Sequence, residues 1–497
     1  MSVAFPWLTL LVGCVGAALL GWLRTRWASS PLPAAGGPRY TERDVLALVL
    51  LVLLALGLRL VGLEARVIDN DEPVGLGMRT LGEWISERDA RLHPPLPLLA
   101  MTWFAGGEVD VVAARQVSVL AGVVSVALAF AIARRVEPRA AALVGLLVAT
   151  APAMLHSSQL ARGYALLACG LLAAHLALSR ALQRARSLDY WAYTLACVLA
   201  ASAEYLAIAP LVADAAVSLW LVRRDPARRV GVVTAFVGAL GVLAFYVPIA
   251  ASSLSLGIGG GPHSPSGAAD ALVQSLRMLG GVAGGPGGAL LLCAALLSLR
   301  FRTALTARVV AVVLVTLAVA LLGAVVTSVR ARYVLHAVPF LLIALGIFAV
   351  ATRLRLLLGG GLVALNVAAL PGYYDRSTTL AEVNTGLPLP GLLGIVADDP
   401  AAPVIVLPYY AIAEPSWRLA RAFPGQDAGN CPVRLCILRK RSRPIYGADA
   451  GEDLEAVFER APHSYVLARR HTRPALPERC VVLGDEGDAT LWRCPRP

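Results

Sequence analysis

The sequence contains little charge for its length. Only 15% of its 497 residues are Asp, Glu, Lys or Arg, whereas 58% are hydrophobic. A soluble domain is usually about half apolar and about a quarter charged. A mean hydropathy of +0.69 and repeated apolar runs of membrane-spanning length exclude an ordinary soluble protein. Because the runs are continuous and do not alternate with polar residues, they also exclude a transmembrane β-barrel.

Lysine is almost absent, since Lys440 is the single lysine among 44 basic residues. The formal charge of +12 is therefore carried by arginine. The arginines form short clusters between apolar runs, as the positive-inside rule predicts for cytoplasmic loops. This arrangement accounts for the basic charge without nucleic acid as a partner. The clusters lie at residues 24–43, 134–139, 180–186, 223–229, 300–308 and 353–355.

With these clusters as cytoplasmic anchors, the apolar runs predict a polytopic all-α membrane protein of about twelve transmembrane helices. No Lys or Arg precedes the first run, which places the N-terminus outside. The expected spans are 4–23, 44–63, 115–133, 140–156, 163–180, 189–205, 206–222, 230–250, 287–299, 309–328, 333–352 and 355–371.

The alternation of spans places three segments outside: 64–114, 251–286 and the residues after about 372. In the first of these, apolar residues between Val74 and Ile85 recur at helical spacing, which predicts a helix on the membrane surface. A helix too short to span is expected after Pro94. The predicted domains are an N-terminal span with its linker at 1–43, a transmembrane domain at 44–371 and an outer domain at 372–497.

The residues after 372 have a different pattern. Short apolar stretches typical of strands alternate with helical ones, which predicts a small extracytoplasmic α/β domain. The expected strands are "PVIVLP", "RLCILR", "SYVLAR", "CVVLG" and "TLWRC", and the expected helices are "SWRLARAF" and "EDLEAVFERA".

Four cysteines lie in this last segment: Cys431, Cys436, Cys480 and Cys494. An even set in an extracytoplasmic domain indicates disulfides, with three connectivities open. A hairpin turning near Gly487 places Cys480 opposite Cys494, which favours that pair and leaves Cys431 for Cys436. A zinc site is disfavoured, because the segment has no paired Cys-x-x-Cys arrangement.

Acidic residues gather in "VIDNDEP", directly after the span at 44–63. In a generic loop, Asp69, Asp71 and Glu72 would be an accidental solvated cluster. Here they lie between a span and the expected surface helix, where burial can tune a carboxylate for proton abstraction. Asp71 is therefore a candidate general base towards a hydroxyl.

Arginines also lie at the outer ends of spans, against the positive-inside trend. An arginine at a span end often only reaches to lipid headgroups, but its paired donors also suit a phosphate. Together with the acids, these arginines suggest a general base for an acceptor and a binding site for an anionic leaving group. The residues concerned are Arg115, Arg162 with Tyr164, and Arg332 with Tyr333, and His93 lies nearby in "RLHPPLP".

Five segments in order resemble the landmarks of the GT-C superfamily of glycosyltransferases, and the most similar group is that of protein mannosyltransferases and aminoarabinose transferases. The resemblance covers about residues 44–350. The stretch Ala203-Glu204-Tyr205 departs from the family's usual Thr-His-Tyr. The segments are "NDEPVGLGMRTLGEWI", "HPPLPLLAMTWF", "ARQVSVLAGVVSVALAFAIARR", "SSQLARGYALLACGLLAAHLAL" and "RARYVLHAVPFLLIAL".

This resemblance implies a sugar donor linked to polyprenyl phosphate and an acceptor that is a lipid, glycan or protein. The family's acidic pair falls on Asp71 and Glu72, with Asp71 as the base of an inverting displacement. Its proline landmark falls on His93 and the two prolines after it. Its phosphate-binding arginines fall on Arg162 and Arg332, beside Tyr164 and Tyr333, and Arg115 either assists or only anchors its helix.

No Gly-rich phosphate loop of the dinucleotide or Walker type is present, so a nucleotide-sugar site is not expected. No cofactor is required, and a divalent metal next to Asp71 and Glu72 is compatible with the sequence but not demanded by it. Two alternatives remain, a flippase or transporter of lipid-linked sugars and a non-catalytic scaffold. The span centres read as almost free of charge, which argues against transport. The Ala- and Arg-rich composition indicates a bacterial inner membrane, with the active site and the last domain on the periplasmic side.

Overall fold

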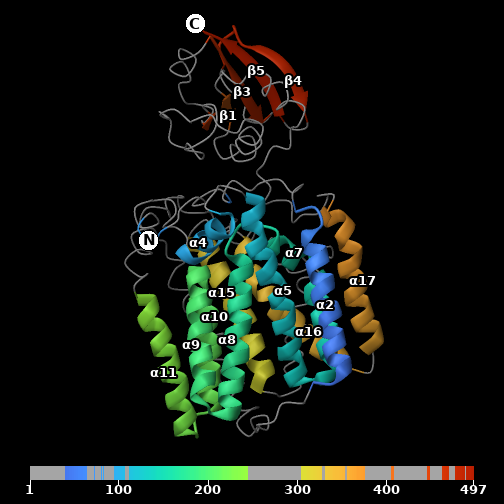
Figure 1. Cartoon of the computed structure of the whole chain (residues 1–497), viewed down its shortest axis with the longest axis vertical. Helices are drawn as coiled ribbons and strands as arrows, with labels where there is room; N and C mark the ends of the chain where they lie inside the picture. The colour runs from blue at the N-terminus through green and yellow to red at the C-terminus, as the bar shows by residue number, and fades with distance from the viewer. Residues whose placement is uncertain are drawn as a thin grey trace. The chain divides into compact units, whose positions relative to one another are not determined.

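The structure, a computed structural model, describes residues 40–63, 72, 80, 82, 94–106, 111–244, 304–326, 331–352, 355–374, 404–407, 445–447, 462–469, 476–486 and 489–496. The chain divides into two compact units. The first comprises Met1–Leu63 and Gly77–Ala381, and the second comprises Glu64–Leu76 and Glu382–Pro497. The described part of the first unit is helical, and that of the second contains a sheet (Figure 1).

The first unit is a bundle of helices that run up and down beside one another (Figure 1). Its elements are α2 (Glu42–Leu60), α4 (Pro95–Phe104), α5 (Val111–Val136), η2 (Pro138–Ala140), α6 (Ala141–Thr150), α7 (Pro152–Ser158), α8 (Tyr164–Arg184), α9 (Ser187–Ala203), η3 (Tyr205–Ala207), α10 (Ile208–Leu221), α11 (Pro226–Leu243), α15 (Ala304–Val326), η7 (Ala331–Ala337), α16 (Val338–Ala351) and α17 (Arg355–Tyr374).

Local signals set where several of these helices begin. Thr41 forms a capping box at the start of α2, in which its hydroxyl accepts from the Asp44 amide at 3.2 Å. Asp225 caps α11 by accepting from the Arg228 amide at 3.0 Å. Pro95 occupies the first position of α4, where a missing N–H costs nothing. The short helix expected after Pro94 is therefore confirmed.

The expectation of one continuous helix at 140–156 is wrong. Two helices, α6 and α7, lie there and meet at a bend of 59°. Pro152 begins α7, and a proline has no N–H to continue the hydrogen bonds of the preceding helix. The loop that connects to α8 follows α7 directly.

The described helices have the composition and surface of membrane spans. Within the described residues, three helices are long and apolar enough to cross a bilayer, and the bent pair of α6 and α7 could be a fourth. Large apolar side chains are exposed on the bundle's periphery, among them Leu53, Trp191, Val230 and Leu356. Such a surface suits lipid and not water. The chain is a multi-pass membrane protein, and the count of twelve spans stays a prediction.

The second unit holds a five-stranded sheet in the order β2-β1-β3-β5-β4. Its strands are β1 (Val404–Leu407), β2 (Ile445–Gly447), β3 (His463–Arg469), β4 (Val481–Glu486) and β5 (Ala489–Pro495). β1 pairs in parallel with β2 and β3, whereas β5 pairs antiparallel with β3 and β4. The central position of β3 explains why successive residues from Ser464 to Ala468 are all buried.

Four of the five expected strands are confirmed, and "RLCILR" and both expected helices lie outside the described residues. β2 was not expected, because its three residues after Pro444 are too short to give an alternating pattern. β4 and β5 form the expected hairpin, and a disulfide joins Cys480 to Cys494 beside it. Cys431 and Cys436 lie outside the described residues.

Candidate functional site

The loop between α7 and α8, residues 159–163, carries Arg162. Arg162 is buried, and its guanidinium lies 6.0 Å from the centre of the Tyr164 ring at the start of α8. The hydroxyl of Ser118, on α5, donates to the Arg162 carbonyl at 3.2 Å. Arg162 and Tyr164, the two residues expected to act together, are thus adjacent. The backbone of Arg162 is held by Ser118 of the neighbouring helix α5.

Gly163 packs where two other segments meet this loop. A Cβ at this position would press on the carbonyl oxygen of Ala203, at the end of α9, and would lie 3.1 Å from Cγ of Pro97, on α4. Only glycine allows so close an approach. The loop is therefore fixed against α4 and α9, and Glu204, the buried residue after Ala203, follows directly on this contact.

Arg115 is fully buried near the start of α5. Its Nη1 donates to the carbonyl of Leu63 at 2.8 Å, which ties α5 to the end of the chain segment that follows α2. The side chain therefore does not reach out to headgroups, as an arginine at a span end often does. It anchors its helix, and a role in binding substrate stays a prediction.

Gln159 fixes the other end of the loop. Its side-chain nitrogen Nε2 donates to the backbone carbonyls of Arg59 at 2.9 Å and Val61 at 2.8 Å. Its side-chain oxygen Oε1 accepts a hydrogen bond from the Tyr373 hydroxyl, on α17, at 2.6 Å. Gln159 thereby holds α2 and α17 against the loop, three residues before Arg162.

Arg59, on α2, is buried among oxygen atoms around the break between α6 and α7. Its Nε donates to the Ser158 hydroxyl at 3.1 Å, and its Nη1 donates to the Ala149 carbonyl at 3.2 Å. Sequence reasoning missed this residue because it lies inside an apolar run. The signal that could have found it is an arginine in the last turn of an apolar span, together with a proline inside a later span.

Arg332 and Tyr333 belong to η7, which packs against α7 and α8. The backbone of these residues is therefore next to the helices on either side of the Arg162 loop. Their side chains lie outside the described part of the chain. Their predicted roles remain predictions.

Asp71 and His93 also lie outside the described residues. Glu72 is described, and its side chain is fully buried. Its segment, Glu64–Leu76, belongs to the second unit. Within the described residues, no group of three or more His, Cys, Asp and Glu side chains could hold a metal ion.

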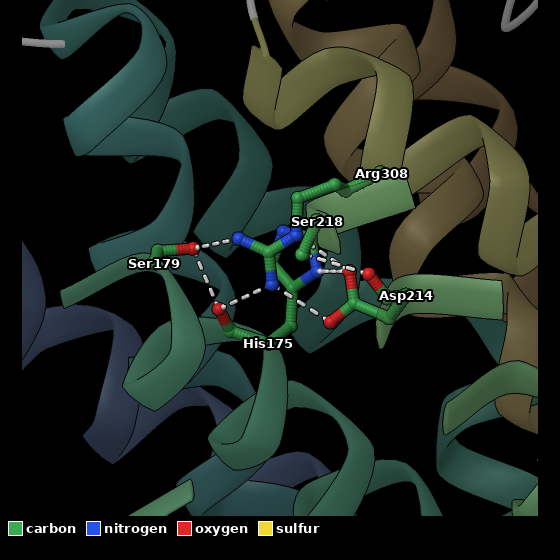
Figure 2. A network of polar contacts seen from close by, with 5 residues as sticks. All are labelled: His175, Ser179, Asp214, Ser218 and Arg308. Atoms are coloured by element: carbon green, nitrogen blue, oxygen red, sulfur yellow. Dashed lines mark hydrogen bonds and ion pairs between the residues drawn. The ribbon is translucent and has the colours of Figure 1, made fainter. Parts of the chain in front are cut away.

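A second polar cluster lies inside the bundle, around Asp214 and Arg308 (Figure 2). The interpretation that the span centres are almost free of charge has an exception in Asp214, which lies in the middle of α10. Arg308, one of the arginines used above as expected cytoplasmic anchors, is 1% exposed and paired with Asp214. Arg134 is likewise buried, with its Nη2 2.8 Å from Oδ2 of Asp44. Sequence position alone does not separate a topological arginine from a packed one.

The chain is similar to a known family in sequence and to known proteins in structure. Residues 93–251 match the family model of dolichyl-phosphate-mannose-protein mannosyltransferase, a segment that includes Arg115 and the whole Arg162 loop. The crystal structure of ArnT from Cupriavidus metallidurans in the apo state superimposes with a TM-score of 0.59 at 14% identity, over 91% of this chain and 98% of that chain. The chain has the GT-C fold. The resemblance read from its sequence segments is thus confirmed.

The structure of ArnT from the same organism bound to undecaprenyl phosphate superimposes with a TM-score of 0.53, again at 14% identity and over 91% of this chain and 98% of that chain. No curated protein sequence matches the chain. At such identity the structural similarity establishes the GT-C fold, and the activity has to be argued from the site.

Proposed function

We propose that the protein is a membrane glycosyltransferase that moves a sugar from a polyprenyl-phosphate donor to an acceptor at the outer face of the membrane. The observation that carries the proposal is the buried Arg162 loop, which lies within the segment that matches the mannosyltransferase family. The GT-C fold extends over nearly the whole chain. The structure of ArnT with bound undecaprenyl phosphate supports a lipid phosphate as the donor's leaving group.

Arg162 and Arg332 would bind the phosphate of the donor. An arginine presents paired N–H donors that match phosphate oxygens. The Arg162 backbone is braced by Ser118, and Gly163 is pinned between α4 and α9. This bracing supports the proposal, because a preorganised donor stabilises developing charge without reorganisation during the reaction.

The proposed chemistry is a single displacement with inversion. The acceptor hydroxyl or amine attacks the anomeric carbon of the sugar while Asp71 removes its proton, assisted by Glu72. The bond between the anomeric carbon and the phosphate oxygen breaks, and the phosphate leaves with the electron pair. The arginines hold the charge that develops on it. His93, Tyr164, Tyr333 and Arg115 would complete the substrate site.

The alternative is a flippase of lipid-linked sugars, and the buried charges within the spans favour it, because such charges often mark transport paths. Asp214, however, uses both carboxylate oxygens to bind Arg308. A closed ion pair of this kind is suited to holding helices together and offers no open position for a moving headgroup. The glycosyltransferase is therefore the better-supported function.

Sugar transfer by purified protein from a mixture of polyprenyl-phosphate sugars tests the proposal. Wild type is compared with Asp71→Asn, Arg162→Lys and the control Arg224→Lys, which changes an exposed arginine between α10 and α11. Asp71→Asn should abolish turnover while donor binding persists. Arg162→Lys keeps the charge but loses the paired donors, so the KM for donor should rise about tenfold or more.

Equal turnover in wild type and Asp71→Asn would remove Asp71 from the mechanism. An unchanged KM in Arg162→Lys would remove Arg162 from the phosphate site. No turnover with any donor, together with donor movement across reconstituted vesicles, would favour the flippase. A parallel assay in EDTA decides whether a divalent metal takes part.

A further inference from the structure

The cluster inside the bundle is built on a two-pronged ion pair between α10 and α15 (Figure 2). Arg308 places Nε 2.6 Å from Oδ1 of Asp214 and Nη2 2.7 Å from Oδ2. The side chains are 1% and 3% exposed. Parallel donors on parallel acceptors fix the direction of an ion pair as well as its distance.

The same guanidinium also reaches α8. Its Nη1 donates to the Ser179 hydroxyl at 2.8 Å, and its Nη2 donates to the His175 carbonyl at 3.2 Å. Ser179 in turn donates to the His175 carbonyl at 2.6 Å, one turn earlier on the same helix. Arg308 therefore joins α15 to both α8 and α10 through all three of its nitrogen atoms.

His175 extends the cluster to α16. Its Nδ1 lies 3.3 Å from Oδ1 of Asp214, and its ring meets Phe340 edge to face, with ring centres 5.6 Å apart and planes at 78°. Phe340 is the third residue of α16 and lies just after η7. The cluster thus contacts both helices that flank η7 in the chain, α15 before it and α16 after it.

These two flanking helices carry very few charged groups. Arg308 is the one ionisable residue in the α15 sequence, and the α16 sequence has none. Between lipid-embedded helices the hydrophobic effect supplies no driving force, so packing and hydrogen bonds decide the contacts. Moving α15 by one residue would rotate it by about 100° and shift it by about 1.5 Å, which would break the Asp214–Arg308 fork.

We propose that Asp214 and Arg308, braced by His175 and Ser179, are positioning residues for η7. They set the rotation and depth of α15 against α8 and α10, and they hold η7 where Arg332 and Tyr333 can meet the phosphate of a lipid-linked donor. The link to the donor rests on the proposed function. The link to the position of η7 does not.

The test replaces the pair with apolar residues in the double variant Asp214→Leu/Arg308→Met. Exchanging both members of a buried ion pair for apolar side chains is often neutral for stability. Removing only one member leaves an uncompensated buried charge, which is destabilising. Arg308→Lys serves as the conservative variant. The control is Asp44→Leu/Arg134→Met, which removes the partly buried ion pair between α2 and α5.

Three quantities are measured: the thermal unfolding midpoint, the hydrogen exchange of the peptide covering residues 331–337, and the KM and kcat for a polyprenyl-phosphate sugar. The Asp214/Arg308 double variant should stay folded, with faster exchange in that peptide and unchanged exchange in α5. Its KM should rise about ten- to hundredfold, with a smaller fall in kcat, as expected for misplaced binding groups. Arg308→Lys should recover part of both effects. The control also removes Asp44 from the capping box of α2, so it should match wild type in the exchange of residues 331–337 and in KM.

If the double variant is poorly folded, Arg308→Lys supplies the same comparison of exchange and KM. Wild-type exchange at residues 331–337 together with wild-type KM, in either variant, would overturn the proposal. If wild type neither transfers sugar nor binds undecaprenyl phosphate, the proposed function fails. The exchange of residues 331–337 then still decides whether the pair positions η7.

Discussion

Arg59 donates a hydrogen bond of 3.2 Å to the carbonyl of Ala149, beside the break between α6 and α7 at Pro152. In an unbroken helix, residue 152 would donate its N–H to the carbonyl of Val148. Proline cannot do so, and Nη2 of Arg59 lies 3.5 Å from that carbonyl instead. The guanidinium of α2 thus takes the place of donors that the broken helix lacks, and its positive charge suits the C-terminal end of α6.

The substitution Gly122→Ala tests how tightly this arginine is packed. A Cβ on Gly122 would lie 2.7 Å from Nε of Arg59 and would press on the Ser158 hydroxyl. We expect the thermal unfolding midpoint in detergent to fall, with a cost of about 1–3 kcal/mol for the displaced buried polar groups. In the control Gly57→Ala, on α2, a Cβ meets nothing within 4 Å, so this variant should unfold at or slightly above the wild-type temperature. Equal midpoints for the two variants would contradict the packing.

The substitution Gly163→Ala should damage function more than stability. The added methyl group has to move the loop away from Ala203 and Pro97, and Arg162 moves with it. We expect kcat/KM for sugar transfer to fall by about a hundredfold, measured beside Gly360→Ala, where a Cβ meets nothing within 4 Å. Wild-type activity in a folded Gly163→Ala protein would show that the position of this loop does not matter.

The disulfide between Cys480 and Cys494 should stabilise the second unit. It closes a loop over a sequence separation of 14, for which loss of chain entropy in the unfolded state predicts about 3 kcal/mol. We expect Cys480→Ser/Cys494→Ser to make the region after residue 382 more sensitive to limited proteolysis, and reduction of wild type to have the same effect. The variant Cys197→Ala, which changes a buried free cysteine, should leave the cleavage pattern unchanged. A wild-type pattern in the double variant would refute this role.

Asp225 should make the start of α11 sensitive to acid. The hydrogen bond from the Arg228 amide holds the pKa of Asp225 below its ordinary value, and the Arg228 side chain adds to this effect. Because the pKa is lower in the folded state, the stability contributed is complete above about pH 4 and is lost as the pH falls through the folded pKa. Loss of the cap in Asp225→Ala should cost about 1 kcal/mol at pH 7.

Thermal unfolding of wild type, Asp225→Ala and Asp225→Asn at pH 7 and near pH 3 measures this contribution. The neutral cap in Asp225→Asn should recover most of the stability at pH 7. The gap between wild type and Asp225→Ala should narrow near pH 3. A gap that widens in acid would reverse the assigned sign.

Much of the fold follows from local sequence patterns. Continuous apolar runs locate the ends of α2, α5, α8 to α11 and α15 to α17 to within seven residues, because a chain in lipid must satisfy its backbone hydrogen bonds within each helix. The strand pattern and the hairpin near Gly487 locate the disulfide of Cys480 and Cys494 for an equally local reason. The arginine and tyrosine at residues 162 and 164 stand out because a charge at the expected outer end of a span runs against the positive-inside trend.

Other features depend on residues far apart in the sequence, and only the tertiary structure decides them. Arg308 lies 94 residues from Asp214, and Arg59 lies 90 residues from Ala149, so neither pair leaves a periodic signal. The sequence by itself determined that the chain crosses the membrane many times and carries the landmarks of a GT-C protein. The tertiary structure decided which arginines are buried, because the stability of a buried charge depends on the oxygen atoms that surround it and not on its neighbours in the chain.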